Sequence, residues 1–99
     1  MLLPTPTDKL VDRDGRPYFL WDCDMTLDEF VRGLREEPPE GRAYLLGKLM
    51  RQARPDDVFS FTTVDDIVAT WPALQRYLGR SEPFWRWLLG HWGFDVEAA

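Results

Sequence analysis

The chain has 99 residues, which is enough for one domain, and 44% of them are hydrophobic, so it can bury a core without a metal or disulfides. Its formal net charge is −5, whereas general nucleic-acid binders have an excess of basic residues. No apolar run is long enough to span a bilayer. The single cysteine, Cys23, excludes an internal disulfide and fits a reducing compartment, so we expect a cytoplasmic protein.

The chain divides into three parts by composition. Residues 1–8 contain Pro4 and Pro6 and predict a loose lead-in without the basic segment of a signal peptide. We expect a single helical domain over residues 9–94 and a C-terminal tail over residues 95–99.

A turn signal lies near the start of the expected domain. Asp14-Gly15 is typical of a tight turn, and Pro17 excludes helix at the residue before it. We therefore predict a short N-terminal β-hairpin or extended arm, with strands around Leu10 and over residues 18–21.

The chain after residue 25 has the apolar periodicity of helices. Thr26 with Glu29 three positions later forms a capping box, Pro72 restarts a helix, and a close helix crossing would account for Gly47 in the middle of its segment. The pattern predicts a mainly α fold, a compact bundle of four to six short helices. The helical segments that we expect are 26–37, 39–54, 55–61, 63–71, 72–79 and 81–94.

The last of these segments is too apolar for one buried stripe. Its apolar side chains cover about 200° of the helix surface, twice the usual arc. Such a helix needs two surfaces to cover it, and we expect these to be its own core and a second chain. We expect a partner to contact Trp85, Trp87, Trp92 and Phe94 as anchors, together with Arg86, because Trp and Arg are enriched at interface hot spots.

The acidic residues concentrate at the other end of the chain. Residues 1–29 hold seven Asp and Glu against three Lys and Arg, nearly the whole acidic excess. This concentration is typical of a solvated face, or of a surface, including Asp22 and Asp24, that docks onto a basic partner.

The stretch YFLWDCDMTL, residues 18–27, places Asp22, Asp24 and Thr26 in a D-x-D-x-T pattern. This pattern resembles the opening of haloacid-dehalogenase-type phosphotransferases, in which the first Asp is the nucleophile and the second the acid/base. That fold needs a parallel sheet, and no strand-like run follows residue 25. We expect Thr26 to cap a helix and the aspartates to stabilise its start, and keep a small phosphotransferase as a remote alternative.

Other chemistry has little support in the sequence. Cys23 and His91 with Asp22 and Asp24 make a poor zinc set, and there is no glycine-rich phosphate loop. We expect no catalytic residue, no metal and no cofactor.

A cluster of arginines near the last segment allows one further interpretation. Arg76, Arg80 and Arg86, with Trp85 and Trp87, could form a stacking platform for nucleic acid. The overall charge argues against it, so we expect no nucleic-acid partner.

Four longer stretches carry a resemblance to a known family: RPYFLWDCDMTLDEF, RAYLLGKLMRQARPDDVFSFTTVDDI, WPALQRYLG and FWRWLLGHW. Over roughly residues 15–93 the chain resembles a family of small bacterial proteins with an RPYFLWD-x-D-x-T opening, often encoded beside nucleotidyltransferase-like toxins. The resemblance implies a non-enzymatic protein-binding module, an antitoxin that masks such a toxin. Nucleotidyltransferases that modify RNA have a basic substrate groove, which an acidic surface could occupy. The alternative is a homodimeric domain whose last helix closes on itself.

Overall fold

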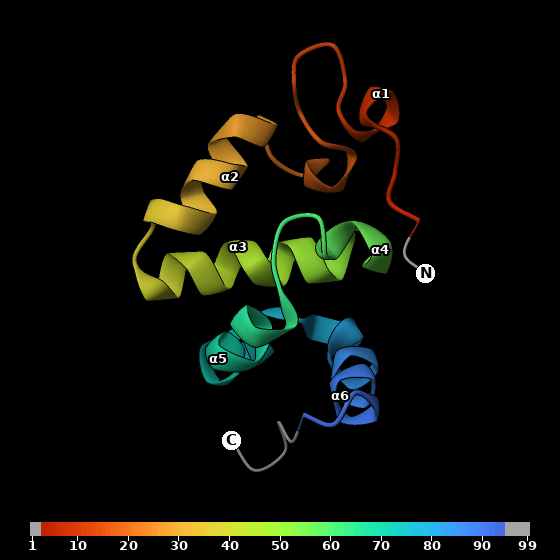
Figure 1. Ribbon diagram of the computed structural model, residues 1–99. Coiled ribbons are helices and arrows are strands. Elements are labelled where there is room, and N and C mark those ends of the chain that lie inside the picture. Colours follow the sequence, from red (N-terminus) through yellow and green to blue (C-terminus); the bar gives the residue numbers. More distant parts are fainter. Residues whose placement is uncertain (1–2, 95–99) are drawn as a thin grey trace.

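A computed structural model describes residues 3–94, and apart from one isolated bridge the regular secondary structure in this part of the chain is helical (Figure 1). The α-helices are α1 (Thr7–Leu10), α2 (Leu27–Glu36), α3 (Pro39–Gln52), α4 (Pro55–Val58), α5 (Val64–Leu74) and α6 (Glu82–His91). Three 3₁₀ helices complete the described part: η1 (Tyr18–Leu20), η2 (Gln75–Tyr77) and η3 (Gly79–Ser81). The prediction of a mainly α fold is confirmed.

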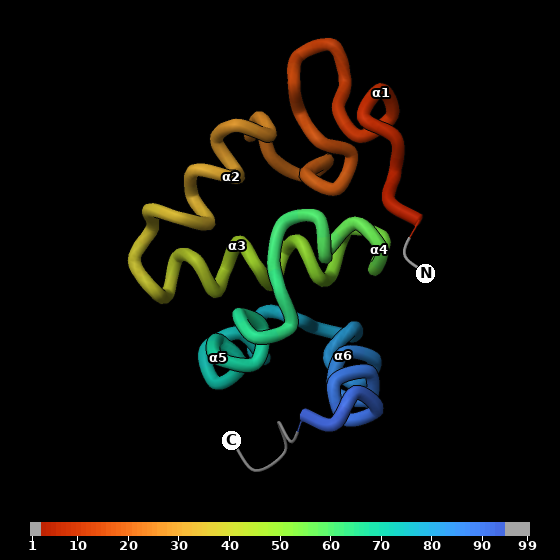
Figure 2. The backbone as a smooth tube through the Cα atoms, viewed as in Figure 1, coloured from red at the N-terminus to blue at the C-terminus, as the bar shows by residue number. Residues whose placement is uncertain are grey.

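Helix α3 is the centre of the domain. It contacts α2, α4, α5 and all three 3₁₀ helices, and Figure 2 shows the N-terminal region and α2 on one side of it with α5 and α6 on the other. A helix covered on several sides is expected to be apolar over most of its surface. The buried residues of α3 agree apart from Lys48, since the others are Ala43, Leu45, Leu46, Gly47, Leu49 and Met50.

The predicted β-hairpin is wrong, although its turn is present. Gly15 has a φ of +79° and the N–H of Asp12 bonds the carbonyl of Arg16 at 2.9 Å, but in residues 3–94 strand pairing amounts to one isolated bridge, between Val11 and Pro17. Pro17 has no N–H to extend a ladder. The expected strands are instead helical, with Leu10 in α1 and Tyr18 in η1.

The predicted capping box at the start of α2 is confirmed. Thr26 Oγ1 accepts from the N–H of Glu29 at 3.2 Å, and the Glu29 carboxylate accepts from the N–H of Thr26 at 2.9 Å, which closes the capping box. The predicted helix break at Pro72 is wrong, because α5 continues through Pro72 to Leu74 and then tightens into η2.

Gly47 lies at the close crossing that its place in the sequence indicates. A Cβ atom built at Gly47 would lie 2.5 Å from the Cβ of Tyr77 and 3.2 Å from its carbonyl oxygen. Only a glycine therefore lets α3 and η2 approach this closely.

Hydrogen bonds hold the lead-in against α4, and we call those that Thr5 and Tyr18 donate to Asp57 the clasp. Asp57, 1% exposed, accepts from the N–H and the hydroxyl of Thr5, both at 2.6 Å, and from the hydroxyl of Tyr18 at 2.5 Å. The N–H of Leu3 bonds Asp56 at 3.0 Å, and Arg54 donates to Thr5. Residues 3–5 are thereby fixed to the domain, whereas the expected tail, 95–99, lies outside the described residues.

Candidate protein-interaction surfaces

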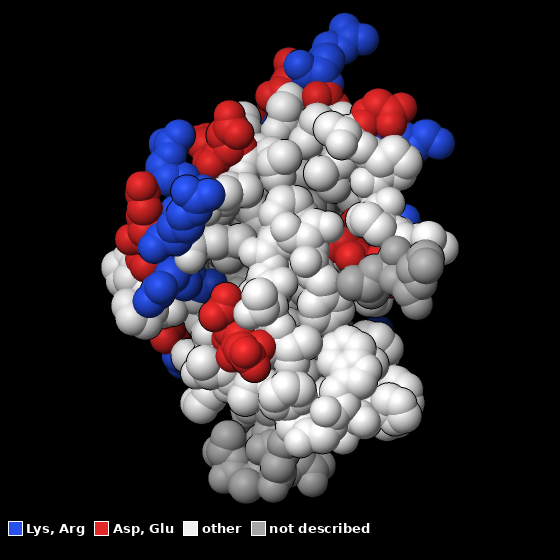
Figure 3. All heavy atoms as spheres, in the orientation of Figure 1, with Lys and Arg blue, Asp and Glu red and all other residues white. Residues whose placement is uncertain are grey.

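Helix α6 divides its aromatic side chains between the core and the solvent. Trp85 and Leu89 are buried, whereas Trp87 is 62% and Phe84 42% exposed. The ring of His91 stacks on Trp87, with the centroids 5.5 Å apart and an interplanar angle of 16°. Figure 3 shows the region around α6, at the lower right, as a surface almost without charged atoms.

Trp85 is a core residue and not the surface anchor that the sequence led us to expect. Its side chain is 1% exposed, its Nε1–H donates to the carbonyl of Met50 at 3.0 Å, and its ring packs edge-on against Phe59. A buried Trp that satisfies its N–H in this way contributes to packing within the domain.

The other expected contact residues near the C-terminal end contact the domain itself. Trp92 is 43% exposed and packs edge-on against Phe59, and Phe94 is half-buried against the core. Arg86 donates to Glu82 and lies over the ring of Trp71, 5.8 Å from its centroid. Its charge is therefore neutralised within the domain.

Asp22, the first aspartate of the D-x-D-x-T pattern, pairs with a lysine of α3. The Nζ atom of Lys48 donates to Asp22 at 2.6 Å, and the side chains are 5% and 32% exposed respectively. The hydrogen bond from Lys48 holds the pKa of Asp22 below its usual value. Burial alone would lower the pKa of Lys48, but the hydrogen bond to Asp22 and the charges of Asp22, Tyr44 and Cys23 together outweigh burial and raise that pKa. The pair ties the segment before α2 to the central helix.

Asp24, the second aspartate, belongs to a cluster around Arg16. The guanidinium contacts Asp24 at 3.1 Å, Asp12 at 3.3 Å and Asp14 at 3.5 Å. Backbone N–H donation from Arg16 is the main reason why the pKa of Asp12 lies below its usual value. One cation shared by three carboxylates leaves a local excess of negative charge.

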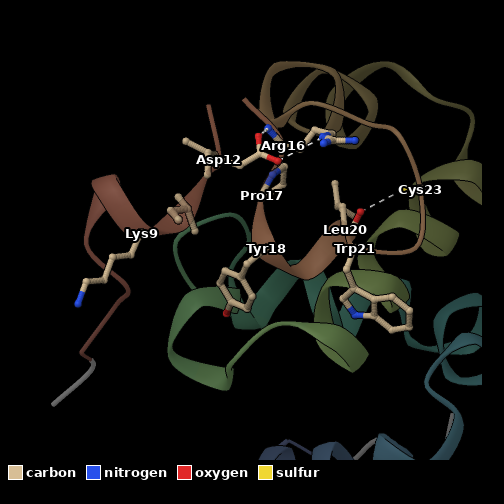
Figure 4. Close-up of a pocket in the computed structure, with 10 residues that line it drawn as sticks. Lys9, Asp12, Arg16, Pro17, Tyr18, Leu20, Trp21 and Cys23 are labelled. Atoms are coloured by element: carbon tan, nitrogen blue, oxygen red, sulfur yellow. Dashed lines mark hydrogen bonds and ion pairs between the residues drawn. The ribbon is translucent and has the colours of Figure 1, made fainter. Parts of the chain in front are cut away.

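Trp21 was missed as a contact residue by the sequence analysis, which placed it in a strand. It is the most exposed large hydrophobic residue described, at 75%. Figure 4 shows its ring at the end of η1, on the rim of a cavity of about 330 Å³ that Lys9, Asp12, Arg16, Tyr18 and Cys23 also line. We call Trp21, Asp12, Asp14 and Asp24 the acidic N-terminal surface. The run of aspartates directly after Trp21 was the signal in the sequence.

The two groups of expected contact residues are not brought together. In Figures 1 and 2 residues 11–26 lie on one side of α3 and α6 lies on the other. A partner that contacts one group need not contact the other. The described part of the chain thus has two separate exposed surfaces, one acidic and one apolar.

The described residues contain neither a metal-binding cluster, nor the sheet of a phosphotransferase, nor a membrane-spanning helix. Within residues 3–94 no three His, Cys, Asp or Glu side chains are placed to hold a metal ion. The same residues contain no named strand, and so no parallel sheet of the phosphotransferase kind around Asp22. Nor does any helix among them have the length and apolar character needed to cross a membrane.

Comparison with known protein families, curated proteins and solved structures gave no match for this chain.

Proposed function

We propose that the protein is a non-enzymatic binding module, an antitoxin that masks the basic substrate groove of a nucleotidyltransferase-like toxin. In this proposal the contact is made by the acidic N-terminal surface. The observation that carries it is Trp21, whose side chain is 75% exposed beside Asp22 and Asp24. Trp is enriched among interface hot spots, so an exposed indole beside these carboxylates favours contact with a partner.

The residues on either side of Trp21 are held in place by the fold. Leu20, directly before it, is 1% exposed in the core, and Asp22, directly after it, is paired with Lys48. The backbone of Trp21 is therefore fixed on both sides, so docking orders little besides its own side chain. Low ordering cost is what makes a Trp effective as an interface hot spot.

The charge around Trp21 indicates the chemistry of the partner. Asp12, Asp14 and Asp24 share the single guanidinium of Arg16, so the surface presents a net negative charge. Negative charge accelerates encounter with a basic surface. A groove that binds RNA phosphates is basic, and occupation by this surface would exclude the RNA. The toxin itself is proposed from the resemblance described above.

Co-expression with a nucleotidyltransferase-like protein encoded beside the gene tests the proposal. We expect a complex that purifies at low salt, and Trp21→Ala weakens it by at least about tenfold, as truncation of a hot-spot Trp does. Raising the salt concentration also weakens it, because the contact joins opposite charges.

Trp87→Ala is the matched control, since it removes an exposed Trp from the opposite side of α3. We expect this variant to bind the toxin like the parent. A complex that is indifferent both to Trp21→Ala and to salt would contradict the proposal.

A further inference from the structure

The outer face of α6 is an exposed helix face without a charged side chain. Phe84, Trp87, Leu88 and His91 recur at positions that share one side of the helix, and Phe84 and Trp87 are 42% and 62% exposed. Exposed faces of single-domain helices normally carry charged residues. We call these residues, with the adjoining Gly90, the α6 face.

The charges that α6 does have are turned to its other side. Glu82 and Arg86 are four residues apart and pair with each other, and Arg86 lies over the ring of the buried Trp71. Nothing charged from α6 itself would have to be desolvated if the α6 face were covered.

Gly90 adds an independent observation. It is exposed within α6, where glycine lowers helix stability relative to alanine. A Cβ atom at Gly90 would meet nothing within 4 Å, so packing in the described domain does not require a glycine there. At Gly47, by contrast, the crossing with Tyr77 does require it. An approaching chain would account for Gly90.

The charge distribution favours a second copy of this chain over a basic partner. The α6 face itself contains no Asp, Glu, Lys or Arg, whereas nearly the whole acidic excess lies in residues 1–29, beyond α3. A two-fold contact sets each surface against itself, so an acidic surface would repel its copy and an uncharged one would not. Contact through α6 also keeps the two acidic N-terminal surfaces apart.

The apolar area is consistent with a dimer of moderate affinity. Weighted by their exposed fractions, Phe84 and Trp87 offer on the order of 200 Å² per copy. A standard interface buries about 800 Å² per partner, so these two rings would supply roughly a quarter of it. The rest of the α6 face supplies more.

We infer that α6 packs antiparallel against α6 of a second copy, with the two-fold axis near Trp87. In this arrangement Phe84 of one copy lies opposite Gly90 of the other, since the two positions are equally spaced about Trp87. The bulky ring then fills the space that the missing side chain leaves. The first turn of α6 in one copy, with Glu82, lies beside the last turn of α6 in the other, with His91. The two helix dipoles are then antiparallel, which is favourable. The inference does not rest on the proposed function.

Sedimentation equilibrium of the full chain, from about 1 μM to about 500 μM, tests the inference. We expect the parent to pass from monomer to dimer within this range and Trp87→Ala to weaken the dimer by at least about tenfold. Trp21→Ala is the matched control and dimerises like the parent. High salt leaves the dimer in place, because the α6 face is uncharged.

Gly90→Gln tests the register separately from the loss of a ring. Glutamine is a better helix former than glycine, so the isolated domain stays as stable as the parent or becomes more stable. Its side chain occupies the space assigned to Phe84 of the second copy, and dimerisation weakens by about tenfold or more. A parent that stays monomeric, or a dimer that tolerates both Trp87→Ala and Gly90→Gln, overturns the inference. Failure of toxin binding with an intact dimer bears only on the proposed function.

Discussion

Lys48 of the central helix donates its hydrogen bond to Asp22, the residue that would be the nucleophile of a D-x-D-x-T enzyme. The lysine is 5% exposed, so its charge depends on this carboxylate. We expect Asp22→Asn to lower the melting temperature by a few degrees, because a nearly buried ammonium loses its counter-charge.

Asp24→Asn is the control for this prediction. Its side chain is 91% exposed and contacts only the shared Arg16, so we expect almost no change in thermal stability. Thermal melts of the two variants by circular dichroism make the comparison. Equal melting temperatures for the two would show that the Lys48 pair does not stabilise the fold.

The clasp at Asp57 makes a second prediction. Asp57→Asn sets an amide N–H₂ against the donors of Thr5 and Tyr18, and we expect a loss of about 2–3 kcal/mol in the free energy of unfolding. The neighbouring Asp56 accepts one hydrogen bond, at an exposed position, so Asp56→Asn costs much less. Urea unfolding measures both, and a larger loss for Asp56→Asn would contradict the assignment.

The same clasp predicts how stability depends on pH. Burial would raise the pKa of Asp57, but hydrogen bonds from Thr5 and Tyr18 outweigh it and the pKa lies below its usual value. The Asp57 carboxylate therefore binds a proton less readily in the folded state than in the unfolded state, where the pKa of an Asp is about 3.9. The stabilisation is complete above that value and is lost as the pH falls through the lower folded pKa. The difference in unfolding free energy between the parent and Asp57→Asn should shrink below about pH 4.

Two helical glycines predict opposite responses to alanine. Gly47→Ala places a methyl group 2.5 Å from the Cβ of Tyr77, and we expect it to destabilise the protein by about 1–3 kcal/mol. Gly90→Ala meets open space and gains up to about 1 kcal/mol from helix propensity, measured in dilute solution. Urea unfolding at low protein concentration measures both, and a stabilising Gly47→Ala would refute the close crossing.

Features that depend on a few neighbouring residues could be predicted from the sequence. The capping box of Thr26 and Glu29 and the glycine at the helix crossing are local signals, and both are confirmed. The hairpin prediction was wrong because burial of Phe19 and Leu20 in η1 stops the pairing after one bridge, and burial is a property of the whole fold.

The candidate surfaces were harder to predict for the same reason. Trp85 and Trp87 are both parts of one broad apolar arc, and only the position of Met50 in the folded chain shows which of them is buried. Trp21 follows an apolar run that reads as a strand, and its exposure depends on where Lys48 holds Asp22. Contacts between residues far apart in the sequence decided each case.

The clasp between Thr5 and Asp57 also has a consequence for the order of folding. It joins residues 52 positions apart, so it closes a loop that contains α2 and α3. Loop closure over that length costs conformational entropy that only the preformed helices can offset. The N-terminal segment should therefore dock after the rate-limiting step, and substitutions in the clasp should accelerate unfolding while leaving the folding rate nearly unchanged.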